Sequence, residues 1–128
     1  MSAANKELSR RFTELFSTGD PALADAILAR DLVFHGTSGD GELHGIDAFK
    51  AFVAQYRQAF PDARSSVEDQ VAEADKVATR WRARGSGFEM DGVTIERIAD
   101  GRIAEVWVAR DELGLMRRLG LGAAVESR

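Results

Sequence analysis

The sequence contains 128 residues, 45% hydrophobic and 30% charged, a size and composition typical of one globular domain spanning residues 1–128. Its net charge of −4 and its lack of a clustered Lys/Arg run exclude nucleic acid as an expected partner. Without cysteine, and with only two histidines, the chain offers no recognisable metal site, and we expect neither a metal nor a cofactor. No apolar run approaches about 18 residues, so we expect no membrane contact and a cytoplasmic location.

Apolar residues at helical spacing predict three helices in the first half of the chain. The first covers residues 4–17. The phrase Thr18-Gly19-Asp20-Pro21 then supplies a C-cap glycine, an N-cap aspartate and a proline for the first turn of a second helix over residues 21–29. Residues 31–35 predict a strand, and a third helix follows over residues 46–60.

The second half of the chain changes to the two-residue alternation of β-strands. Four strands are predicted, over residues 65–73, 77–84, 88–98 and 103–111. Helices that precede a run of strands predict an α+β fold, in which three helices from the N-terminal half pack on one face of a curved antiparallel sheet. The sheet should form a cone whose hollow end holds one apolar small molecule.

Asp111 is the first candidate for chemistry in this hollow. Counting back by two along the last strand places Trp107, Glu105 and Ile103 on the same face as Asp111. If this face meets the helices, Asp111 lies at the rim of the hollow, where partial loss of solvent makes a carboxylate a better base. A carboxylate of this kind acts as general base on apolar carbon acids. The alternative is structural: Asp111 ends the strand and caps the next turn.

Aromatic and histidine side chains are candidates for contact with the ligand. His35 ends the first strand, and its imidazole would act as a base or as a donor to substrate. The alternative for His35 is a structural bond to a backbone carbonyl. Phe12, Tyr56 and Trp107 are predicted to line the hollow, with the Tyr56 hydroxyl as a polar contact, although most such rings simply fill a core.

Glu105 shares the predicted inward face and would need a cationic partner there. The length of the turn before Glu105 decides which residue lies beside it. A three-residue loop, Ala99-Asp100-Gly101, places Arg97 beside Glu105, whereas a two-residue turn places Glu96 there. We expect the three-residue loop and an Arg97–Glu105 pair, which would be structural as easily as functional.

Several phrases occur in the order seen in a known family: Thr18-Gly19-Asp20, Phe34-His35, Ala59-Phe60-Pro61-Asp62, Asp75-Lys76-Val77-Ala78, and the block from Arg97 to Trp107 followed by Asp111-Glu112-Leu113-Gly114-Leu115. Together with the order of elements, they resemble the SnoaL-like polyketide cyclase family of the nuclear transport factor 2-like superfamily, over residues 5–120. The resemblance implies a cone-shaped fold, ring closure by aldol chemistry without a cofactor, Asp111 as the acid/base and His35 at the matching strand end. One departure is Arg84-Gly85-Ser86-Gly87-Phe88, which replaces a longer segment that helps to roof the pocket in family members.

We therefore expect a cyclase- or isomerase-type protein that acts on an apolar carbonyl compound. Asp111 would remove a carbon-bound proton, while His35 or Tyr56 would stabilise the enolate oxygen. The alternative is a non-catalytic module for small-molecule binding or dimerisation, which the short turn favours because an open cone excludes water poorly. We also expect a homodimer that buries the outer sheet face, on which Val106 and Val108 are predicted to lie.

Overall fold

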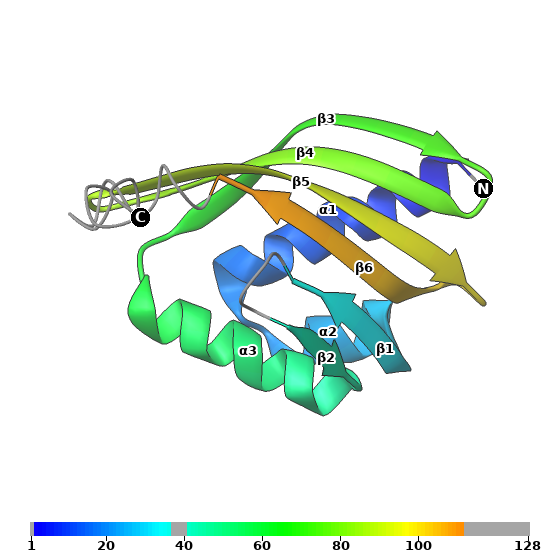
Figure 1. The fold of residues 1–128 in the computed structure, drawn as a ribbon, viewed down its shortest axis with the longest axis horizontal. Coiled ribbons are helices and arrows are strands. Elements are labelled where there is room, and N and C mark those ends of the chain that lie inside the picture. The colour runs from blue at the N-terminus through cyan, green and yellow to red at the C-terminus, as the bar shows by residue number, and fades with distance from the viewer. Residues whose placement is uncertain (1, 37–40, 112–128) are drawn as a thin grey trace, which may run out of the picture.

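The computed structural model describes residues 2–36 and 41–111. Its elements are the helices α1 (Ser2–Thr18), α2 (Pro21–Ile27) and α3 (Ile46–Ala59) and the strands β1 (Leu28–His35), β2 (Glu42–His44), β3 (Arg64–Glu73), β4 (Lys76–Gly85), β5 (Phe88–Ala99) and β6 (Arg102–Arg110). The expected α+β architecture is confirmed, because the helices lie on one side of a curved sheet (Figure 1). Within the described residues, no helix has the length and apolar character needed to cross a membrane. The predicted C-terminal tail, residues 112–128, lies outside the described residues.

The junction between α1 and α2 forms as its sequence predicts. Gly19 has a φ of +66°, and its N–H donates to the carbonyl of Leu15 at 2.7 Å, which closes the end of α1. The Asp20 carboxylate accepts the N–H of Ala22 at 2.9 Å and caps α2, which Pro21 begins. The second helix is shorter than predicted, since the backbone is already extended at Leu28, the first residue of β1.

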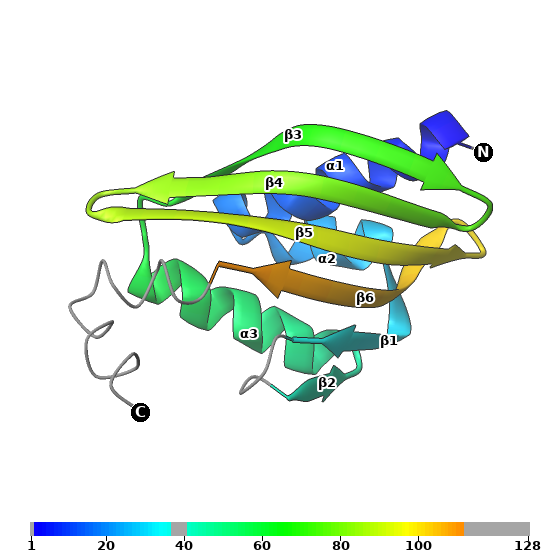
Figure 2. The same ribbon diagram turned by 45° about the horizontal axis from the view of Figure 1, so that its top comes forward.

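The sheet has six strands in the order β2-β1-β6-β5-β4-β3. Strands β3 to β6 form the predicted antiparallel meander, which can be followed strand by strand in Figure 2. Two features were not predicted: the short strand β2 pairs with β1, and β1 runs parallel to β6. The parallel pair joins the first and last long strands, so both halves of the chain contribute to one continuous sheet.

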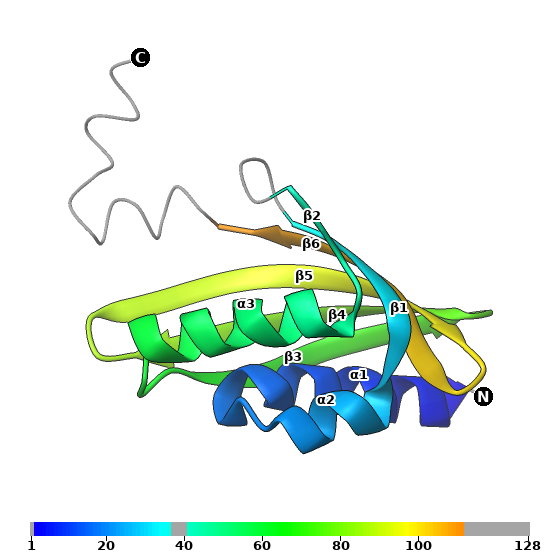
Figure 3. The ribbon, with the colours of Figure 1, turned by 90° about the horizontal axis from the view of Figure 1, so that it is seen from below.

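Phe49 of α3 lies at the centre of the core between the helices and the inner face of the sheet. Its side chain is fully buried. Its ring centroid lies between 5.1 and 6.1 Å from those of Phe12, Phe16, Phe34 and Phe52. This aromatic cluster connects α1, α3 and β1, and the sheet curves over the helices that carry it (Figure 3).

A β-bulge in β6 changes which side chains of the last strand face the helices. Arg97 pairs with Glu105, but the next residue of β5 pairs with Ile103, so Ala104 is an extra residue in β6. An extra residue reverses the alternation, and Ile103 before the bulge and Val106 after it are both fully buried. The prediction that the odd-numbered residues face inward along the whole strand is therefore wrong beyond the bulge.

The turn between β5 and β6 also differs from the predicted three-residue loop. Ala99 pairs with Arg102, and Asp100-Gly101 forms a two-residue turn with φ values of +53° and +74°. This turn alone would pair Glu96 with Glu105. The extra residue Ala104 shifts the register by one, so that Arg97 pairs with Glu105 as predicted.

Because of the same bulge, the outer face of the sheet carries different side chains from those predicted. Val106 is buried in the core and Val108 packs against it, so neither lies on the outer face as predicted. The large apolar side chains that are exposed among the described residues are Val71, Val93 and Ile95, on β3 and β5.

Candidate functional site

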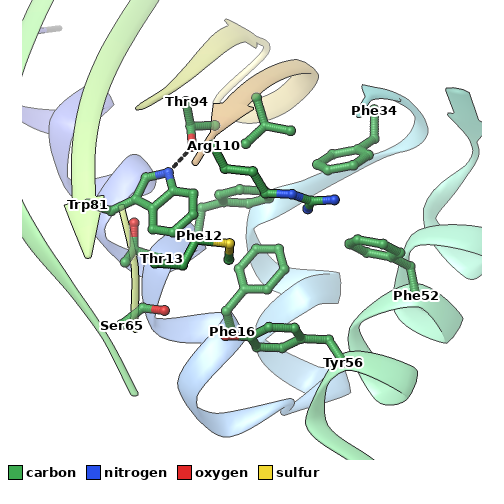
Figure 4. Close-up of a pocket in the computed structure, with 12 residues that line it drawn as sticks. Phe12, Thr13, Phe16, Phe34, Phe52, Tyr56, Ser65, Trp81, Thr94 and Arg110 are labelled. Atoms are coloured by element: carbon green, nitrogen blue, oxygen red, sulfur yellow. Dashed lines mark hydrogen bonds between the residues drawn. The ribbon is translucent and has the colours of Figure 1, made fainter. Parts of the chain in front are cut away.

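A cavity lies between the inner face of the sheet and the helices α1 and α3 (Figure 4). Its atom-free space, which includes open solvent at the mouth, is about 530 Å³. The part that the centre of a water molecule can reach is about 50 Å³, room for a few waters, so a larger ligand would extend into the mouth. The walls are mainly aromatic, with Phe12, Phe16, Phe34, Phe52 and Tyr56 among them.

Trp81 of β4 forms a further wall because a glycine stands next to it. Trp81 pairs with Gly92 on β5, and its indole lies against the Gly92 backbone. A Cβ atom at Gly92 would be only 2.3 Å from Cζ2 of the indole. The indole Nε1–H donates to the Thr94 hydroxyl at 2.6 Å, which fixes the ring in the cavity (Figure 4).

We expect Gly92→Ala to displace the Trp81 ring and weaken the binding of an apolar probe at least tenfold, because the added methyl and the indole cannot share the same space. Near-UV circular dichroism would report the ring movement, and a fluorescence titration with 2-acetylnaphthalene would report the affinity. Val93→Ala is the matched control, since Val93 is the next residue and lies 41% exposed on the opposite face. An unchanged spectrum and affinity for Gly92→Ala would contradict this account of the cavity.

The polar groups of the cavity come together from three elements. Tyr56 is on α3, Ser65 on β3 and Arg110 at the end of β6, and all three line the cavity. Burial raises the pKa of the Tyr56 phenol, while the charge of Arg57, a hydrogen bond with Ser65 and the charge of Arg110 oppose this rise. The hydroxyls and the guanidinium are donors that suit a ligand oxygen. In Figure 4 the Arg110 guanidinium extends toward Phe34 and Phe52.

Of the predicted site residues, Phe12 and Tyr56 line the cavity, but Asp111 does not. Asp111 is exposed, and its backbone N–H donates to the carbonyl of Asp91 at 2.9 Å. Arg110 takes the place in the cavity that the parity of the strand had given to Asp111. Sequence reasoning missed Arg110, although the alternation of Val106, Val108 and Arg110 was a signal that could have found it.

The other predicted residues form a cluster on the outer face of the sheet. The His35 ring stacks on Trp107 with centroids 5.3 Å apart, and its Nε2 lies 2.6 Å from a carboxylate oxygen of Glu105. Arg97 donates to the other Glu105 oxygen at 3.2 Å, and Nδ1 of His35 lies 3.0 Å from Glu42. The hydrogen bond with His35 is the main cause that lowers the pKa of Glu105, and the contact with Arg97 adds to it.

The predicted Arg97–Glu105 pair is therefore present, but on the face opposite to the cavity. The expectation that His35, Glu105, Arg97 and Trp107 enter the hollow is wrong in its geometry, because the bulge turns Glu105 and Trp107 outward and His35 lies beside them on β1. The cluster links β1, β2 and β6 by charge and stacking.

Glu96 is the carboxyl group that lies on the inner face instead. It is fully buried, and the Ser9 hydroxyl of α1 donates to its Oε1. Burial raises the pKa of Glu96 to about 8, although the hydrogen bond from Ser9 opposes this rise. Sequence reasoning considered Glu96 only as the alternative to Arg97 beside Glu105, and did not predict a buried acid.

Three helices packed against a curved six-stranded sheet, with a cavity between them, define an α+β fold class that a nuclear transport factor 2-like protein from Cytophaga hutchinsonii shares, at 16% identity and a TM-score of 0.70 over 91% of this chain and 94% of that one. Within this class the chain belongs to the SnoaL-like polyketide cyclase family, whose model matches residues 6–119. The resemblance seen in the sequence is thereby confirmed for fold and family.

Solved structures agree with this assignment. A loop-truncation variant of IdmH is 31% identical, with a TM-score of 0.81 over 91% of this chain and 99% of that one. Wild-type IdmH from Streptomyces antibioticus, a candidate polyketide cyclase, is 28% identical, with a TM-score of 0.81 over 91% of this chain and 98% of that one. A candidate ketosteroid isomerase from Kribbella flavida, 18% identical with a TM-score of 0.75 over 87% and 80%, shares the fold. A comparison with curated proteins gives no match.

Proposed function

We propose that this protein binds an apolar carbonyl compound in the aromatic cavity and promotes removal of a proton from the carbon next to the carbonyl group. The observation that carries the proposal is that Tyr56, Ser65 and Arg110 all line one cavity, half of whose lining residues are aromatic. An enolate oxygen formed there would accept hydrogen bonds from donors that are already in place, which lowers the barrier to its formation. Membership in the SnoaL-like polyketide cyclase family supports a cyclase- or isomerase-type reaction.

Asp111 is the carboxylate that we propose as general base. It follows Arg110, the last residue of β6, and its exposed side chain is not among those that line the cavity, so a substrate would have to meet it at the open mouth. It also matches the acid/base position that the family resemblance implies. In the reaction, a carbon-bound proton passes to the Asp111 carboxylate, and the electron pair of the C–H bond becomes part of the enolate. Tyr56 and Arg110 would hold the enolate oxygen in place of His35, which lies on the outer face.

The exchange of the methyl protons of 2-acetylnaphthalene in D2O, followed by proton NMR, tests this function. We expect the wild-type protein to accelerate the exchange, and Asp111→Asn to reduce the acceleration about 100-fold or more, as loss of a general base does. Arg110→Leu and Tyr56→Phe should each reduce it by removing a donor to the enolate oxygen. Asp31→Asn, the same substitution at an exposed aspartate of β1, is the control. An Asp111→Asn variant that retains the wild-type rate would remove Asp111 from the mechanism.

A second candidate function is non-catalytic binding of the same class of compound. One observation favours it: among the described residues that line the cavity there is no carboxylate or imidazole. Tight binding of the naphthyl ketone without any exchange by the wild-type protein would select this function over the first.

A homodimer and a cytoplasmic location stay predictions. The outer face that a second copy would cover carries Val71, Val93 and Ile95, which are 67%, 41% and 39% exposed. Burial of these side chains would remove apolar surface from water and so favour association.

A further inference from the structure

Glu96 stands at the end of a chain of buried hydrogen bonds that crosses from the sheet to helix α1. Ser9 has one hydroxyl hydrogen and donates it to Glu96, so Thr79 must donate to Ser9 across their 2.5 Å contact. Gln70 in turn donates to Thr79 at 3.1 Å and to the Lys6 carbonyl at 3.0 Å. Three strands and one helix are therefore held together by one neutral network.

The network lies directly behind the cavity. Thr13 of α1 and Thr94 of β5 both line the cavity. A residue of the network lies on the same face of each element: Ser9 beside Thr13, and Glu96 beside Thr94. Ser9 precedes Thr13 by one helical turn and accepts its hydroxyl through the Ser9 carbonyl at 3.3 Å. Glu96 follows Thr94 by two residues along β5, on the inner face of the sheet. A shift of α1 at Ser9 would therefore move the cavity wall formed by this helix.

We propose that Glu96 is a positioning residue whose protonation state controls the packing of α1 on the sheet, and through Phe12 and Thr13 the ligand affinity of the cavity. The second part rests on the proposed function, since it takes the cavity as the binding site. The neutral acid allows α1 to pack closely. The ionised acid favours partial separation of α1 from the sheet, because water can then reach the charge.

The surroundings of Glu96 offer nothing to compensate a negative charge. Its second oxygen, Oε2, is buried and has no hydrogen-bond partner among the described residues. The groups that face it are neutral: Ser9 from α1, and its partners in register, Val77 on β4 and Val106 on β6. Thr79 of β4 is linked to it through Ser9. Beyond Thr79, β3 contributes the amide of Gln70, and Lys6 of α1 contributes its backbone carbonyl to that amide. An unpaired charge at such a site is costly, so ionisation would strain the contact between helix and sheet.

The experiment measures the affinity for 2-acetylnaphthalene between pH 6 and 9.5, together with amide hydrogen exchange in α1 corrected for its intrinsic pH dependence. This ketone does not titrate in the range, so a change in affinity belongs to the protein. With a pKa of Glu96 of about 8, binding restricted to the neutral form should be about tenfold weaker at pH 9 than at pH 7. Amides of α1 should lose protection over the same range.

Glu96→Gln should abolish both pH effects, since the amide keeps the hydrogen bond from Ser9 and cannot ionise. Ser9→Ala should move both transitions to higher pH, because the Ser9 bond holds the pKa of Glu96 down. Glu7→Gln, at an exposed position of the same helix, is the matched control and should behave as wild type.

The outcomes separate this inference from the proposed function. Identical pH profiles for the wild-type protein and Glu96→Gln would overturn the inference and leave the function standing. Absence of ketone binding at every pH, with α1 protection still dependent on Glu96, would overturn the function and the affinity part of the inference, and support the control of α1 packing.

Discussion

Phe49→Ala is expected to lower the free energy of unfolding by about 3–5 kcal/mol, the loss typical for a large aromatic side chain removed from a core. Phe49 is fully buried, and its ring meets Phe12 and Phe16 of α1 and Phe34 of β1. Truncation removes apolar area and leaves a cavity where helices and sheet meet. The surrounding rings come from several elements and cannot all move inward together, so the site should collapse poorly.

Urea unfolding followed by far-UV circular dichroism measures this loss. Val71→Ala is the control, because the Val71 side chain is 67% exposed and its truncation should change stability by less than about 0.5 kcal/mol. A loss at Phe49 no larger than that at Val71 would mean that the aromatic cluster does not hold the helices to the sheet.

The second large effect is a decrease in stability as the pH rises through the neutral range. Burial raises the pKa of Glu96 from 4.5 to about 8, so between these values the folded chain binds a proton that the unfolded chain has released. Stability then falls by at most about 1.4 kcal/mol for each pH unit in this window. The contribution of the protonated Glu96 carboxyl to stability is fully present below about pH 4.5 and is lost as the pH rises through 8.

Urea unfolding at intervals from pH 5 to pH 9 measures this slope. The difference between the wild-type protein and Glu96→Gln isolates it, because all other titrating groups are common to both. We expect this difference to grow steadily in favour of Glu96→Gln as the pH rises. Glu73→Gln, at an exposed position of β3, should give a curve parallel to that of the wild-type protein. A constant difference between wild type and Glu96→Gln would show that the Glu96 carboxyl titrates normally.

The parts of the fold that depend on local sequence were predictable. Gly19, Asp20 and Pro21 each have a conformational preference that a helix end requires, and the structure uses each of them as predicted. The inner and outer faces of β4 also follow its alternation: Val77, Thr79 and Ala83 are buried. Such features depend on residues only a few positions apart, so they can be predicted from a single sequence.

The faces of β6 were not predictable in the same way, because they depend on pairing between strands. The Asp100-Gly101 turn and the extra residue Ala104 together set the register, and each alone would give a different result. The sequence identified Arg97 and Glu105 as a pair but placed the pair in the wrong layer. Because every side chain after the bulge is affected, one unrecognised residue exchanged Asp111 for Arg110 at the cavity.

The burial of Glu96 could not be deduced for a related reason. A glutamate between Ile95 and Arg97 in a strand is normally expected to face water. Its burial depends on Ser9 and Thr79, which are 87 and 17 positions away in the chain and meet only when α1 packs across the sheet.

The bulge at Ala104 has an evolutionary consequence. If Ala104 took part in regular pairing with Arg97 in place of the bulge, the two surfaces of the following segment would be exchanged, presenting Glu105 and Trp107 to the interior and Val108 and Arg110 to the exterior. The pairing of one residue thus separates two cavities with different side chains on the same scaffold. Relatives that pair this residue differently would align residue for residue along β6 while directing opposite sets of side chains into the cavity.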